Sequence, residues 1–375
     1  MSLNMKTHKT TNSSFTPARY IMSAEHVSAC FAAIGKSPPA AHIYADLPKA
    51  AATLPKNLQA RKGKLTKQAQ AMFSLLARPE RVLIFHEYFD GNINGIETRF
   101  IGNHTGDLWV IVSKKPEGVW DFALLTSKTQ LLATLDQLSG FSEITPLNEE
   151  FMVNLSLAAI TAFAAIADKI RISTLQHKLD RGLTDQVWMS KFDPADLGNI
   201  IDAEQNQPFS QSKVLLLSLL SGGASLEVIS KDQLDAGVHD LIKAGLMDAD
   251  QTLTSDGHFL ISYLLHPHTI LAFDSLRQYS RTLIADNLFF IHTASTLLSG
   301  IWDRDMKGKI NALTLCVTTP SQAMKVLGDI VLYSDVAPTK PAPKRTGKTL
   351  AKFCPECGTE NTRKLKFCTH CGAEL

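Results

Sequence analysis

Hydrophobic and polar positions alternate along several short stretches of the chain, as they do in strands with one buried face. In the first half, four stretches rich in β-branched and aromatic residues are expected to be strands: 81–89, 96–103, 108–113 and 120–125. In the second half the clearest strands are expected at 288–293, 298–303 and 310–318. Short connections between such strands are typical of an antiparallel meander. The pattern therefore predicts an α+β fold with an antiparallel sheet.

Two segments of the chain are similar to each other, which indicates an internal duplication. Residues 63–85 and 251–273 align without a gap, with seven identities in 23 positions, and the similarity resumes where 125–130 aligns with 317–322. The identical pairs include Pro79 with Pro267 and Phe85 with Phe273. In each half a Leu-Thr pair is expected to open a helix that ends at the proline. The two repeats should form a pseudo-two-fold α+β body.

The chain is expected to divide into six segments. They are a disordered polar tail (1–20), the first α+β repeat (21–148), a helical connector (149–204), the second α+β repeat (205–333), a Pro/Lys linker (334–352) and a zinc ribbon (353–375). The connector contains an uncharged run of 17 residues, 151–167. A membrane span needs about 20 apolar residues, so a buried helix is expected there.

Composition excludes several classes of protein. With 375 residues, 45% hydrophobic and 20% charged, the chain has a globular balance and is not a largely disordered protein. Six cysteines are too few for a disulfide scaffold, and the N-terminus lacks the apolar core of a signal peptide. A cytoplasmic location is therefore expected. The formal net charge of +2 combines +3 in residues 1–20 and +4 in 334–352 with about −5 in 21–333.

Four cysteines lie in the last 23 residues, in two C-x2-C-G motifs. They are Cys354, Cys357, Cys368 and Cys371. Each tight turn can present two sulfurs to one ion, and the glycine supplies the positive φ that the turn needs. Four thiolates around one structural Zn²⁺ form a closed tetrahedral site, with an iron centre or a redox dithiol as the alternatives. The segment resembles the short zinc ribbons found at one end of many bacterial proteins, and it is expected to be unfolded without metal.

Residues 212–265 have the order of elements of a winged-helix unit: helices, an acidic turn and a further helix. DNA binding would need basic groups on the helix and the wing. Instead Lys231 and Lys243 are outnumbered by acidic residues: Asp232, Asp235, Asp240, Asp248 and Asp250. The shape is therefore expected without DNA readout. The matching first-half segment is basic, with Lys49, Lys56, Arg61, Lys62, Lys64 and Lys67, and is either a solvated face or a contact for nucleic acid or an acidic partner.

Two further stretches resemble the EspG chaperones of type VII secretion. They are residues 75–82, with the sequence LLARPERV, and the opening MSAEHV at 22–27 followed by AAIG at 32–35. The resemblance covers about 15–335. It implies a pseudo-two-fold α+β fold and the binding of a partner protein in the cytoplasm without catalysis. The zinc ribbon is a departure from that family.

These observations favour a non-enzymatic cytoplasmic adaptor or chaperone that binds a protein partner and carries a structural zinc ribbon. No catalytic or cofactor-binding residues, small-molecule substrate or membrane contact are expected. The alternative is a nucleic-acid-binding transcriptional regulator that uses the basic linker, the ribbon and the first-half basic segment. An enzyme would need a concave pocket with convergent titratable groups. In a groove between the two halves, an apolar or mildly acidic surface would favour a peptide partner, and a continuous basic surface would favour nucleic acid.

Overall fold

The computed structural model describes most of the body of the protein. The described residues are 17–38, 44, 47–48, 53–60, 63–89, 92–115, 118–144, 151–182, 191–206, 213, 216, 220, 231–265, 267–279, 282–293, 296–304 and 309–332. The chain divides into two units, Met1–Tyr333 and Ser334–Leu375. All described residues belong to the first unit, so the expected linker and zinc ribbon lie outside them.

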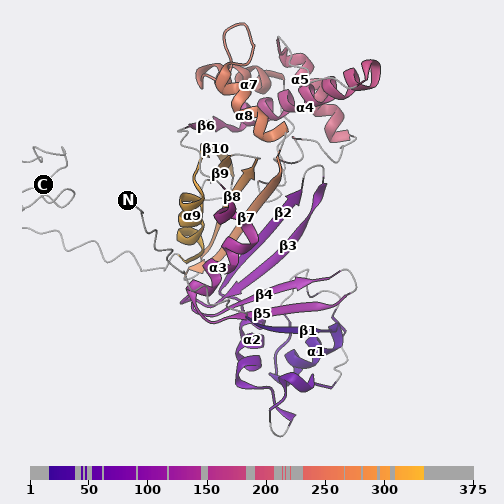
Figure 1. The fold of residues 1–375 in the computed structure, drawn as a ribbon, viewed down its shortest axis with the longest axis vertical. Coiled ribbons are helices and arrows are strands. Elements are labelled where there is room, and N and C mark those ends of the chain that lie inside the picture. The colour runs from indigo at the N-terminus through magenta and orange to yellow at the C-terminus, as the bar shows by residue number, and fades with distance from the viewer. Residues whose placement is uncertain are drawn as a thin grey trace, which may run out of the picture. The chain divides into compact units, whose positions relative to one another are not determined.

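The first half of this unit runs from a strand through helices into a meander and a closing helix (Figure 1). Its strands are β1 (Ala18–Met22), β2 (Arg81–Phe89), β3 (Asn92–Gly102), β4 (Trp109–Lys114) and β5 (Trp120–Leu125). Its helices are α1 (Ala24–Ala33), α2 (Lys67–Ala77) and α3 (Lys128–Ser139), with short 3₁₀ turns η2 (Lys56–Leu58) and η4 (Phe141–Glu143). Ser23, Thr66 and Ser127 each cap a helix by accepting a backbone N–H bond.

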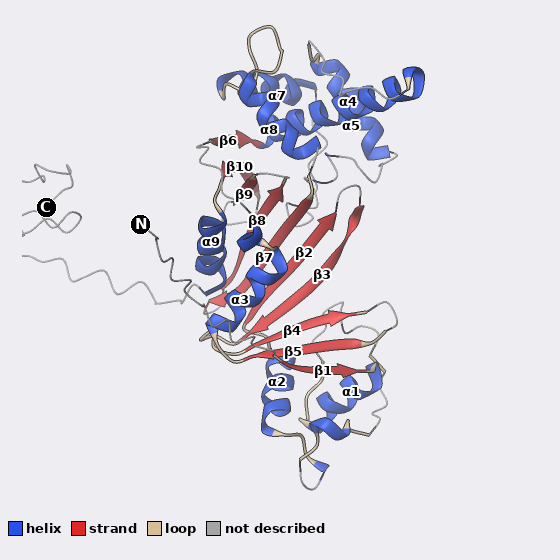
Figure 2. Ribbon diagram, viewed as in Figure 1, coloured by secondary structure: helices blue, strands red, loops and turns tan. Residues whose placement is uncertain are grey.

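The second half repeats this order of elements (Figure 2). Its strands are β6 (Met152–Ser156), β7 (Thr269–Tyr279), β8 (Thr282–His292), β9 (Leu297–Arg304) and β10 (Ile310–Val317). Its helices are α4 (Leu157–Arg181), α5 (Pro194–Asn206), α7 (Lys231–Lys243), α8 (Ser255–Leu265) and α9 (Pro320–Leu332). The described residues therefore form an α+β fold, as the hydrophobic pattern predicted.

All ten strands belong to one antiparallel sheet, in the order β1-β5-β4-β3-β2-β7-β8-β9-β10-β6. The two halves meet where β2 pairs with β7. At the middle of that pairing Phe85 lies opposite Phe273, the residue with which the internal alignment matches it. From β2 outward, the strands of the first half follow in the order β3, β4, β5 and then β1. From β7 outward, the strands of the second half follow in the order β8, β9, β10 and then β6. The strand order therefore has the same pattern on both sides of the centre.

Local geometry repeats between the halves as well. An isolated bridge joins Gln59 to Leu65 before α2, and another joins Met247 to Leu253 before α8. Each bridge lies beside a residue with positive φ, Gly63 at 69° and Gln251 at 63°. The equivalent capping threonines, Thr66 and Thr254, each accept a hydrogen bond of 3.2 Å from the backbone N–H three residues on. Similar turns therefore precede α2 and α8.

Three apolar clusters hold helices against the sheet. A central cluster, which includes Phe85, Phe100, Phe273 and Phe290, packs under α3 and α9, and these two helices lie side by side (Figure 1). Because side chains alternate along a strand, neighbours such as Ile101 and Phe289 face the opposite side of the sheet. There a first-half cluster packs under α1 and α2, and a second-half cluster packs under α4 and α8.

Both edge strands differ from the sequence expectation. Strand β1 includes residues 18–20, which were assigned to the polar tail, and β6 occupies the start of the connector that was expected to be helical. In β6, Leu155 is buried while Met152 and Asn154 are exposed. This alternation is too short to be recognised inside an apolar run, and pairing with β10 decides it. Strand β7 was also missing from the clearest expected strands.

Helix α4 begins directly after β6, where the Ser156 hydroxyl accepts a hydrogen bond from the Ala159 N–H. Its first half is buried on nearly all sides, in the part of the uncharged run that is helical. Among the described residues, no helix has the length and apolar character to cross a membrane. The helical part of the run therefore belongs to the core of the second half.

The central aromatic contact can be measured by a double-mutant cycle. The rings of Phe85 and Phe273 have centroids 5.1 Å apart, and both are buried. We expect Phe85→Leu and Phe273→Leu to couple by about 0.5–1.5 kcal/mol in urea denaturation, because such ring pairs add to simple burial. As a control, Phe85→Leu combined with Phe31→Leu should be additive, since Phe31 lies in the first-half cluster. Equal coupling in both cycles would contradict the prediction.

The repeated turn predicts opposite effects for two reciprocal substitutions. Gln251 has a left-handed backbone, which disfavours residues with a Cβ, whereas the equivalent position holds Gly63. Gln251→Gly should stabilise the protein by about 0.5–1 kcal/mol, after the entropy cost of glycine is subtracted. Gly63→Gln should destabilise it by about 1 kcal/mol. Thermal and urea unfolding measure both, and a stability loss in Gln251→Gly would refute the argument.

Candidate functional site

A groove of about 500 Å³ lies between α9 and the adjacent face of the sheet. Strands β7, β8 and β9 form its floor, and α9 forms one wall. Its lining residues are Arg277, Ala285, Asp286, Asn287, Ile301, Trp302, Asp303, Arg304, Val326, Asp329 and Ile330. The groove lies in the second half, next to the central strand pair, rather than between the two halves.

The apolar part of the groove comes from both of its sides. On β9, Ile301 is 41% exposed, although strand residues on a covered face are normally buried. On α9, Val326 and Ile330 are half-buried and four positions apart, so they lie on one side of the helix. These three side chains form an apolar strip that protein atoms cover only in part.

The charged part of the groove is mildly acidic. The Nη2 atom of Arg277 lies 3.3 Å from Oδ2 of Asp286, and Arg277 is largely buried while Asp286 is half-buried. Burial lowers the pKa of Arg304, although Asp274 opposes that effect, and an arginine stays charged at neutral pH. The side chains of Asp303 and Asp329 are exposed and form no ion pair with a described residue. The lining residues therefore carry three carboxylates and two guanidinium groups, which is a net charge of −1.

A second polar feature crosses the centre of the opposite face. Nε2 of His86 lies 3.6 Å from Oδ2 of Asp274, and Asn287 donates a hydrogen bond to the same aspartate. His86 and Asp274 are the residues that directly follow the two aligned segments, 63–85 and 251–273. Nearby, Arg99 donates to Glu97 at 2.5 Å. The network mixes both signs of charge, so it is not a basic surface.

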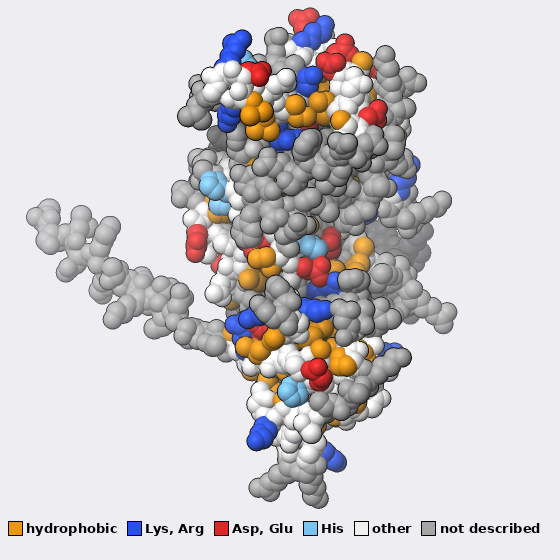
Figure 3. All heavy atoms as spheres, turned by 90° about the vertical axis from the view of Figure 1, so that its right-hand side faces the viewer, with side chains coloured by type: hydrophobic (Ala, Val, Ile, Leu, Met, Phe, Trp, Pro, Cys, Tyr) orange, Lys and Arg blue, Asp and Glu red, His pale blue; other side chains and the backbone are white. Residues whose placement is uncertain are grey.

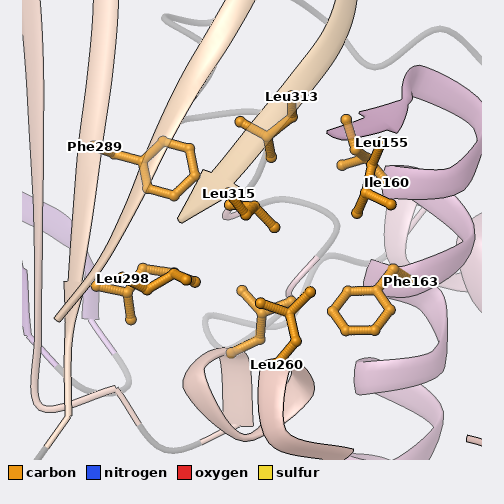
Figure 4. Close-up of a pocket in the computed structure, with 10 residues that line it drawn as sticks. Leu155, Ile160, Phe163, Leu260, Phe289, Leu298, Leu313 and Leu315 are labelled. Carbon is orange, nitrogen blue, oxygen red and sulfur yellow. The ribbon is translucent and has the colours of Figure 1, made fainter. Parts of the chain in front are cut away.

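The enclosed pocket of the second-half cluster is packed core (Figure 4). Its free volume is about 10 Å³, and ten apolar side chains line it, among them Leu155, Phe163 and Leu313. Such a space could hold one water at most, and it has no polar partner to offer. It therefore cannot be a ligand site.

The zinc ligands expected from the sequence, Cys354, Cys357, Cys368 and Cys371, lie outside the described residues. Within the described ranges, no group of three or more His, Cys, Asp or Glu could hold a metal. The other two cysteines are free thiols. Burial raises the pKa of Cys30 to about 12 and also raises that of Cys316. Both therefore stay protonated at neutral pH, which makes them poor nucleophiles.

The basic segment before α2 and the acidic turn before α8, both identified in the sequence, also carry opposite charges in the structure. Lys56, Lys64 and Lys67 are exposed around η2 and the start of α2. In the equivalent turn before α8, hydrogen bonds from Thr252 and Asp250 lower the pKa of Asp248. That turn keeps its negative charge at neutral pH, which opposes contact with phosphate. Lys49, Arg61 and Lys62 lie outside the described residues.

One face of the molecule shows the same mixture of charges (Figure 3). Among its described side chains, basic and acidic groups are interspersed with hydrophobic ones instead of forming one basic patch.

Sequence reasoning missed the groove. Strand 298–303 was expected, and Ile301 lies inside it, but alternation alone places Ile301 on a face without saying whether a helix covers that face. The acidic residues come from three separate elements, β8, β9 and α9. Only the path of the chain brings them together.

Comparison with known proteins supports one segment clearly. A family model for the zinc-ribbon domain matches residues 353–375, so this segment belongs to a domain type that binds zinc. No curated protein matches the chain.

Two solved structures from Mycobacterium tuberculosis are weakly similar. One is the type VII secretion system chaperone EspG5 in complex with a PE25-PPE41 dimer, at 10% identity and a TM-score of 0.40, covering 84% of this chain and 96% of that one. The other is HtdX (Rv0241c), at 11% identity and a TM-score of 0.14, covering 80% of this chain and 99% of that one. Neither score establishes a shared fold.

Proposed function

We propose that the chain is a non-enzymatic cytoplasmic adaptor or chaperone for a protein partner, and that the groove beside α9 is where the partner binds. The observation that carries the proposal is the pairing of a partly exposed apolar strip with exposed carboxylates in that groove. A mixed apolar and mildly acidic surface suits a peptide or protein segment, whereas nucleic acid would need basic groups. The groove lacks a cysteine, serine or histidine among its lining residues, which favours binding over catalysis.

The same proposal includes an internally duplicated, pseudo-two-fold body with winged-helix-like units. It is supported by the matching strand order on either side of the β2–β7 pair, and by the equivalent bridges and capping threonines before α2 and α8. The helix, bridge and helix around Met247 and Leu253 supply the winged-helix-like order.

The proposal also assigns one structural Zn²⁺ to Cys354, Cys357, Cys368 and Cys371. The donor set fits the ion, because four thiolates in two short turns complete a tetrahedral shell and leave no position for substrate. The ion would therefore hold the ribbon folded rather than take part in a reaction.

The binding proposal is tested at Ile301. Ile301→Glu places a charge in the apolar strip without touching the core, so stability should change by less than about 0.5 kcal/mol. In quantitative affinity capture from the source cells, the variant should lose proteins that the wild type retains. Ile96→Glu is the matched control, because Ile96 is 56% exposed and does not line the groove.

Identical protein sets for wild type and both variants would refute the groove as the binding site. A regulator of transcription would behave differently: the full chain would bind a DNA duplex with an affinity that falls steeply with salt, and deletion of 334–375 would abolish that binding.

The metal assignment predicts a stoichiometry that can be counted. The purified chain should hold one zinc, measured by plasma mass spectrometry, and Cys354→Ser with Cys357→Ser should remove it. Because residues Ser334–Leu375 form a separate unit, unfolding of the body should be unchanged. Cys316→Ser is the control and should keep its zinc. Retained metal in the double variant would rule out these ligands.

A further inference from the structure

The groove continues into an open shelf on the sheet. On the face that carries α9, the side chains of the outer strands β9, β10 and β6 remain half-buried or exposed. They are Ser299, Ile301, Asp303, Ala312, Thr314, Cys316, Met152 and Asn154. The opposite face of the same strands is packed against α4 and α8. Among the described residues, no helix covers this side of the outer strands, whereas helices cover the other side.

We propose that this shelf binds an amphipathic α-helix of the partner, with its apolar side on the strip of Ile301, Val326 and Ile330 and with Lys or Arg along its flanks. The inference rests on the proposed function and deepens it by naming the chemistry of the partner. The strip is two-sided, since Ile301 rises from the sheet while Val326 and Ile330 project from α9. A cylinder laid in that corner contacts both sides.

Backbone hydrogen bonding favours a helix over an extended segment. The floor of the groove is the face of a sheet, and the N–H and C=O groups of its strands are already paired within the ladder. An extended segment placed there would bury its own polar backbone without partners. A helix satisfies its backbone internally and can bury one apolar side at no such cost.

The same sheet face already binds helices in this way. Helices α3 and α9 lie side by side over its centre, where they bury Leu131, Leu135, Leu327 and Val331. A partner helix next to α9 would continue this layer outward. Helix-on-sheet layers are a common way to cover an apolar sheet face.

The exposed charges of the groove indicate which charges the partner helix should carry along its flanks. Arg277 is already paired with Asp286, whereas Asp303 and Asp329 are exposed on β9 and α9. The two free carboxylates lie on different elements that line the groove, so cationic side chains on both flanks of a bound helix could reach them. Such exposed pairs select the partner and weaken with salt.

The test uses the full-length protein and three labelled peptides of about five helical turns. The first contains leucine at helical spacing with lysine elsewhere, the second has the same residues in strict alternation, and the third replaces lysine by glutamate. In fluorescence anisotropy at low salt, the first should bind about tenfold more tightly than either of the others. Its affinity should fall as salt rises.

Variants then locate the binding. Asp303→Lys with Asp329→Lys should weaken the first peptide about tenfold, and Ile301→Lys should do the same. The matched controls are Asp235→Lys with Asp250→Lys, which changes the net charge equally away from the groove, and Ile96→Lys. Circular dichroism checks that each variant is folded. The controls should bind like the wild type.

Three outcomes would overturn the inference. If the alternating peptide binds as tightly as the first, helical spacing does not matter. If the control variant Asp235→Lys with Asp250→Lys weakens the first peptide as much as the groove variant does, the peptide binds only through the overall charge of the protein. If the glutamate peptide binds more tightly than the lysine peptide, the partner's flanks are acidic and not basic. If cellular capture depends on Ile301 while the peptides behave in one of these ways, the proposed function stands and only the helical partner is refuted. If capture is also independent of Ile301, the groove itself is refuted.

Discussion

The antiparallel pairing of β2 with β7 is the interaction on which the rest of the structure depends. It joins two similar halves into one ten-stranded sheet and places Phe85 against Phe273 at its middle. Left unpaired, each of these strands would be a long apolar edge, which is a hazard for aggregation. Because side chains alternate, its register decides which residues of β2 and β7 face each layer of helices.

The central pair determines where helices can cover the sheet. Helices α3 and α9 share the middle of one face, and the remaining helices that contact the sheet pack toward the two ends of the other. Within the described part of the chain, no helix covers the outer strands of the second half beside α9, where the groove forms. The pairing also brings His86 and Asp274 within 3.6 Å.

Sequence patterns predicted local elements best where several signals agreed. Strands 81–89 and 120–125 have the expected bounds, and capping threonines mark the starts of α2 and α8. Prediction failed at β1 and β6, because an edge strand of five residues has too few alternating positions to stand out. Prediction also failed at the groove. The exposure of Ile301 depends on where α9 packs on the sheet and not on the residues next to Ile301 in sequence.

The sequence by itself determined the alternation of the strands, the similarity of 63–85 to 251–273 and the spacing of Cys354, Cys357, Cys368 and Cys371. Each of these depends on residues close together in the chain or on direct comparison of two segments. Only the tertiary structure decided the strand order, the central Phe85–Phe273 contact and the joining of Asp303 with Asp329 around an uncovered apolar strip. Those features depend on which face of the sheet each helix covers. That choice is made by packing between elements far apart in sequence.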